Sequence, residues 1–169
     1  MIYQEKLNLN HPLIWIILLP IIAFLGYGIV QQLVIGQPFG QNPAPDFLLL
    51  FFFILPLGLL IALVNARLHY QLDEQGIRYQ FFPFHLGKYQ LKWEDVDEVY
   101  VRRYKALKEF GGWGIRTNLS NHKAYNVPGD KGMCLEVVKK SGKKIVFSTQ
   151  NPQQLRQYLD SLSHKGKPH

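Results

Sequence analysis

Residues 62–82 read ALVNARLHYQLDEQGIRYQFF, and two different hydrophobic patterns meet inside this stretch. Its first residues end an uncharged run, FLLLFFFILPLGLLIALVNA, that occupies 47–66. From Arg67 onward apolar and polar side chains alternate in two segments, 68–72 and 77–81, with a turn at 73–76 between them. Alternation is the pattern of β-strands, whereas an uncharged run of about 20 residues is typical of a transmembrane helix. The stretch therefore predicts where a membrane segment ends and a strand-rich domain begins.

A second uncharged run, LIWIILLPIIAFLGYGIVQQLVI, occupies residues 13–35. At a rise of about 1.5 Å per residue, each run is long enough to cross a hydrocarbon core of about 30 Å. The first run is too long for the apolar region of a signal peptide, and its flank is not basic. We predict transmembrane helices at 13–35 and 47–66, joined by a loop at 36–46.

The distribution of lysine and arginine predicts the orientation. Of the 19 Lys and Arg residues, only Lys6 precedes residue 67, and the loop at 36–46 has none. The positive-inside rule then places residues 1–12 and the segment after the second helix in the cytoplasm, with the loop outside. Neither predicted helix carries a charged residue or histidine, which argues against an ion path through them.

Residues 67–163 predict about seven short strands and one closing helix. The clearest strands, 133–139 and 143–149, flank a tight turn at Ser141-Gly142. Asn151 and Pro152 suit the start of a helix, and an apolar stripe follows at helical spacing. Its members are Leu155, Tyr158, Leu159 and Leu162. The expected fold is an α+β membrane protein: a two-helix hairpin, then an antiparallel β-barrel closed by an amphipathic helix, with a disordered tail at 164–169.

A glycine-rich motif, EFGGWGIR, occupies residues 109–116. Glycine-rich phosphate loops work because backbone amides converge at the start of a helix, and the polar segment after this motif does not predict a helix. We interpret Gly111, Gly112, Trp113 and Gly114 as a structural motif, with a turn at Gly111-Gly112 and a strand at 113–117.

Three segments resemble bacterial pleckstrin-homology-like (PH-like) domains attached to small two-span membrane proteins. They are KWEDV at 92–96, EFGGWGIR at 109–116, and the hairpin and helix at 143–162. The resemblance implies a PH-like barrel at 67–163, a location in the bacterial cytoplasmic (inner) membrane, and a role in binding rather than catalysis. The turn at 73–76 reads DEQG and is acidic, so phosphoinositide binding is not expected.

Sequence spacing offers no catalytic, cofactor or metal motif. One cysteine and six histidines show no zinc-like spacing, and nothing resembles a nucleophile elbow. Two surfaces stand out instead. Phe82 and Phe84 fall outside the alternating core pattern and predict a contact surface. Four lysines surround one hairpin tip, where they are either anionic-lipid contacts or a solvated strand end. They are Lys139, Lys140, Lys143 and Lys144.

These features predict a membrane-anchored binding or assembly module rather than an enzyme. Its expected partners are the bilayer and either another protein or further copies of the chain; membrane anchoring argues against nucleic acid. The alternative is an auxiliary subunit of a membrane transporter or envelope enzyme that acts through its two helices.

Overall fold

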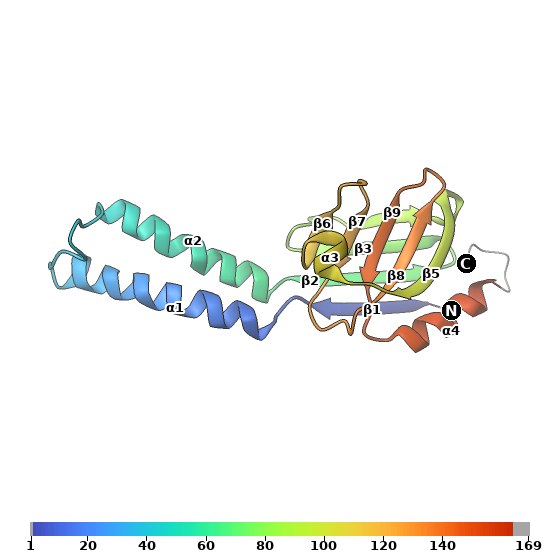
Figure 1. The fold of residues 1–169 in the computed structure, drawn as a ribbon, viewed down its shortest axis with the longest axis horizontal. Coiled ribbons are helices and arrows are strands. Elements are labelled where there is room, and N and C mark those ends of the chain that lie inside the picture. Colours follow the sequence, from blue (N-terminus) through green and yellow to red (C-terminus); the bar gives the residue numbers. More distant parts are fainter. Residues whose placement is uncertain (1, 164–169) are drawn as a thin grey trace. The chain divides into compact units, whose positions relative to one another are not determined.

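Residues 2–163 are described by the computed structural model, in which the chain divides into two units (Figure 1). We call residues 10–65 the helix unit, and residues 2–9 together with 66–163 the strand unit. The disorder expected at 164–169 lies outside the described residues.

The helix unit confirms two helices that are long and apolar enough to cross a membrane, at Pro12–Val34 and Asp46–Val64. The first consists of α1 (Pro12–Ile29) and a π-helical end, η1 (Val30–Val34); the second is α2 (Asp46–Val64). Only 11 % and 17 % of their most apolar windows are buried, which is too little for core helices of a soluble domain. The side-chain amide of Gln32 donates to Ala44 O (2.8 Å) and to Asp46 Oδ1 (2.6 Å), which ties the end of the first helix to the start of the second.

The strand unit contains a strand that the sequence analysis did not predict. Residues before the first helix form β1 (Tyr3–Asn8), which pairs antiparallel with β2 (Arg67–Asp73) from Tyr3 opposite Leu72 to Asn8 opposite Arg67. Beyond the ladder, Leu9 N–H donates to Ala66 O at 2.9 Å. The strand unit is therefore built from segments that precede and follow the helix unit in the sequence. Residues 67–163 alone lack its first strand.

The buried carboxylate of Glu5 connects β1 to residues 149 and 150, which follow the last strand. Glu5 is 5 % exposed and accepts four hydrogen bonds. The donors are Tyr3 OH (2.8 Å), Tyr70 OH (2.5 Å), Thr149 Oγ1 (2.8 Å) and Gln150 N–H (2.7 Å). Glu5 thus joins β1, β2 and the segment after the last strand.

The strands form two sheets that are not closed into one barrel. Sheet A has the order β1-β2-β3-β4 and sheet B the order β5-β8-β9-β7-β6. The further strands are β3 (Gly76–Phe82), β4 (Tyr89–Lys92), β5 (Val96–Arg103), β6 (Gly114–Thr117), β7 (Lys123–Asn126), β8 (Met133–Lys139) and β9 (Lys144–Ser148). The chain passes from sheet A to sheet B through a 3₁₀ turn, η2 (Trp93–Asp95), which separates β4 in one sheet from β5 in the other.

Two details differ from the expected barrel. The described residues contain nine strands, eight of them after residue 66, where about seven were expected. The pairing is also not wholly antiparallel, since β7 and β9 run parallel. This arises because β8 lies between them in the chain and forms its hairpin with β9, leaving the other edge of β9 for β7.

The main core lies between the sheets. The ring centroids of Tyr70 on sheet A and Phe147 on sheet B are 5.4 Å apart, and those of Tyr79 and Phe147 are 5.0 Å apart. Helix α4 (Pro152–Ser163) begins at Pro152 as predicted. The predicted apolar stripe of α4 is buried, and Tyr158 OH donates to Leu72 O at 3.0 Å.

A smaller cluster covers the other face of sheet B. A short helix, α3 (Ala106–Phe110), was not predicted, because five residues are too few to show a helical period. Phe110 from this helix packs with buried residues of three strands and of the segment after β5. They are Tyr104, Ala124, Cys134 and Val146. Sheet B therefore has buried apolar residues on both faces.

Candidate functional site

The predicted aromatic surface lies at the end of β3 and in the connection from β3 to β4. Phe82 is 50 % and Phe84 is 53 % exposed, and Leu86 beyond them is 97 % exposed. The connection is held in place at its base, because His85 N–H donates to Phe81 O (2.8 Å) and Phe81 N–H donates to His85 Nδ1 (3.2 Å). We call Phe82, Phe84 and Leu86 the apolar loop. What it contacts stays a prediction.

The four predicted lysines do not act as one group. Lys144 Nζ contacts Glu136 Oε1 at 2.8 Å, so its charge is already paired. Lys140 is exposed, and its backbone N–H donates to Asp95 O at 3.0 Å. Lys139, Lys143 and Lys144 line a cavity of about 310 Å³, together with Lys123, Tyr79, Asn121 and Ile145. Sequence spacing could not identify Lys123 or Tyr79, because they come from other strands.

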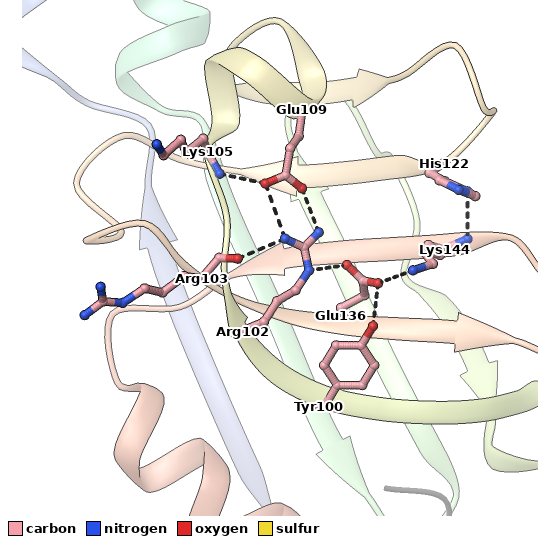
Figure 2. A network of polar contacts seen from close by, with 8 residues as sticks. All are labelled: Tyr100, Arg102, Arg103, Lys105, Glu109, His122, Glu136 and Lys144. Carbon is pink, nitrogen blue, oxygen red and sulfur yellow. Dashed lines mark hydrogen bonds and ion pairs between the residues drawn. The ribbon is translucent and has the colours of Figure 1, made fainter.

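A network of polar contacts lies on the outer face of sheet B (Figure 2). Glu136 is 1 % exposed and accepts from Tyr100 OH (2.7 Å), Arg102 Nε (2.5 Å) and Lys144 Nζ (2.8 Å). Burial alone would raise the pKa of Glu136, but the hydrogen bonds from Lys144, Tyr100 and Arg102 outweigh burial and lower it. The carboxylate is therefore held ionised by its partners.

The same network holds α3 against the sheet. Arg102 uses its other two nitrogens to contact Glu109, at 2.7 Å from Nη2 and 3.3 Å from Nη1. Glu109 also accepts from Lys105 N–H at 2.9 Å, ahead of the first turn of α3. Two carboxylates thus face Arg102 and Lys144, and the charges balance. This arrangement is suited to positioning α3 and the glycine motif that follows it.

The glycine motif ends α3 and turns the chain into β6. Gly111 has φ 71, Gly112 φ 138 and Gly114 φ 101, all in the region that side-chain-bearing residues rarely adopt. Gly111 N–H donates to Leu107 O at 3.1 Å and Gly112 N–H to Ala106 O at 3.1 Å, which completes the helix end. The helix precedes the glycines, whereas a phosphate-binding loop needs a helix after them. The motif has the geometry of a turn.

Gly114 allows a test of this structural interpretation. A side chain at Gly114 would meet open space but would have to adopt φ 101. We expect Gly114→Val to lower the free energy of unfolding by about 1–3 kcal/mol, the usual cost of such backbone strain. Gly114→Ala should account for most of that loss, because strain rather than crowding causes it. Thermal unfolding of the full chain in detergent measures both variants; a valine variant that melts like the wild type would contradict the interpretation.

Within residues 2–163, no three His, Cys, Asp or Glu side chains gather in a way that could hold a metal ion. The single cysteine, Cys134, is buried, and burial raises its pKa to about 12. Its thiol is therefore not activated as a nucleophile. The features with potential to bind are the apolar loop and the lysine-lined cavity.

A scan against protein-family models and a search of curated proteins both return no match for this chain. The resemblance to bacterial PH-like membrane proteins therefore stays a prediction that rests on the three quoted segments.

Proposed function

We propose that this chain is a membrane-anchored binding module, in which α1 and α2 cross the bilayer and the strand unit presents the binding surfaces. The observation that carries the proposal is the pairing of β1, which precedes the two helices in the chain, with β2, which follows them. Paired strands must lie on the same side of a bilayer. A chain that crosses the bilayer twice returns to its starting side, so it meets this requirement. The charge distribution favours the cytoplasmic side, and the three quoted segments favour a PH-like unit in a bacterial inner membrane.

The apolar loop is proposed to contact the membrane interface. Phe82 pairs with Arg67 in the ladder between β2 and β3. Arg67 follows the end of α2 at Val64 by three residues, a span of at most about 11 Å. In this proposal, α2 ends at the membrane surface, so the covalent chain keeps Phe82 near it. Exposed aromatic rings are favourable at such an interface, where their apolar parts leave water.

A reporter cysteine beside the rings tests this contact. Leu86→Cys labelled with the dye NBD places a probe in the apolar loop, and buried Cys134 should not compete for the label. In phosphatidylcholine nanodiscs, spin-labelled lipids should quench this dye. Phe82→Ser with Phe84→Ser should reduce the quenching severalfold. The variant should stay folded, because half of a buried phenylalanine ring contributes about 1–1.5 kcal/mol and the two rings together about 2–3 kcal/mol. Such a loss lowers the melting temperature by several degrees.

The matched control is Leu119→Cys, which is fully exposed in the connection from β6 to β7. Quenching that is equal at positions 86 and 119, or unaffected by the double substitution, would contradict the proposed contact. Quenching that grows with protein concentration in the absence of spin-labelled lipid would instead indicate self-association, and would also contradict it. The alternative role, as an auxiliary subunit acting through the helices, stays a prediction.

A further inference from the structure

The lysine-lined cavity lies within the strand unit, between its two sheets. Lys123 on β7 pairs with Ile145 on β9, and the Tyr79 ring on β3 is 5.0 Å from that of Tyr125 on β7. The cavity volume of about 310 Å³ is at the lower end of the range for small-ligand sites. Its wall combines an aromatic ring, an aliphatic side chain and several ammonium groups.

Three of these ammonium groups are not neutralised. Within residues 2–163, no carboxylate lies within 4.0 Å of the Nζ of Lys123, Lys139 or Lys143. The fourth lysine, Lys144, is paired with Glu136. Burial and then the charge of Lys123 lower the pKa of His85, so this histidine adds no further positive charge near the lysines. The cavity wall therefore has an excess of positive charge.

The lysines and Asn121 lie at strand ends and in turns that are fixed by hydrogen bonds. Lys139 N–H donates to Lys143 O at 2.9 Å, which holds the two residues across the hairpin. On the other side, His122 Nδ1 accepts from Lys144 N–H at 3.2 Å, and Asn118 Oδ1 accepts from His122 N–H at 3.0 Å. A binding site benefits when its groups are positioned before the ligand arrives.

We propose that this cavity binds a phosphate monoester. Such a group carries about −1.5 to −2 charges at neutral pH, which suits three lysines better than the single charge of a carboxylate. The organic part of the ligand contacts Tyr79 and Ile145, and the phosphate lies between Lys123, Lys139 and Lys143. A soluble organic phosphate and a lipid headgroup share this chemistry.

Titration of the full chain tests the proposal without relying on the apolar loop. In detergent at about 0.15 M salt, glycerol 3-phosphate should shift the amide NMR signals of Asn121, Lys139 and Gly142. Sodium acetate should not do so at equal concentration. In separate samples, nanodiscs of phosphatidylcholine with phosphatidic acid are compared with phosphatidylcholine alone. Shifts from the lipid only, or from the soluble ester only, both support the site and identify the source.

The triple variant Lys123→Gln, Lys139→Gln and Lys143→Gln should weaken binding by at least about tenfold. Its matched control, Lys6→Gln with Lys92→Gln and Lys108→Gln, removes the same charge from exposed lysines outside the cavity. Lys143→Gln alone, at an exposed hairpin tip, should weaken binding even if the triple variant does not fold. Equal loss in the control, binding of acetate as tightly as the ester, or no response to either phosphate source would overturn the proposal.

Discussion

Substitution of Gly76 by alanine is expected to unfold the strand unit, or to lower its free energy of unfolding by more than about 3 kcal/mol. Gly76 begins β3 with φ 144, and a Cβ there would overlap the carbonyl oxygen of Leu91 and lie 3.0 Å from the Lys92 Cα. Both obstacles are backbone atoms of β4, held by pairing of Gly76 with Lys92 and of Ile77 with Leu91. Neither a rotamer change nor a small shift relieves the overlap.

Trp93 provides a local measurement of this effect. It is buried directly after β4, and its Nε1–H donates to Asp73 O at 2.8 Å across the turn that contains Gly76. Thermal unfolding of the full chain in detergent, followed by tryptophan emission with Trp15→Phe and Trp113→Phe so that only Trp93 emits, should show an early transition or none. Gly87→Ala is the control, since a Cβ there meets open space. A Gly76→Ala protein that melts within a few degrees of the control would show that β4 moves aside easily.

Glu5→Ala should produce the second large effect, a loss of about 3–5 kcal/mol in the free energy of unfolding. The substitution removes the acceptor for two tyrosine hydroxyls, one threonine hydroxyl and one backbone N–H. Tyr70 is 0 % exposed, so water cannot replace the lost acceptor without opening the core. Buried donors that lose their partner carry the full cost of desolvation.

The control for Glu5→Ala is Lys6→Ala, the neighbouring residue on the same strand, whose side chain is exposed. It should change stability by less than about 0.5 kcal/mol. Limited proteolysis gives a second measurement, because loosening β1 should expose the segment around Thr149 and Gln150 to cleavage. If Glu5→Ala and Lys6→Ala melt together, β1 is not held by its carboxylate in the way described.

The local sequence pattern was sufficient to predict the elements that bury one face against a neighbouring element. Helix α4 begins at Pro152, and the hairpin of β8 and β9 lies where the alternation and Ser141-Gly142 predicted it. Each of these signals is contained within about a dozen residues, so no knowledge of distant partners was needed. The same holds for the two apolar helices, whose length and lack of charge were sufficient.

Elements that depend on distant partners could not be predicted. The β1 segment contains Gln4, Glu5 and Lys6, and its partner strand begins after both helices. The separation into two sheets depends on a three-residue turn at η2, which is too short to show a hydrophobic period of its own. The cavity combines Tyr79, Lys123 and Lys143 from three separate hairpins or strands, and no spacing rule relates them.

The pairing of β1 also determines the order in which the protein can be completed during translation. The ribosome makes β1 first, but its partner β2 follows only after both apolar helices, and the donors to Glu5 at Thr149 and Gln150 come later still. A nascent chain must therefore carry β1 unpaired through the synthesis of the helices, and a chain that stops before residue 149 lacks two of the four donors to Glu5. In the proposed membrane-anchored protein, the two helices are therefore inserted before the strands that flank them in sequence can fold.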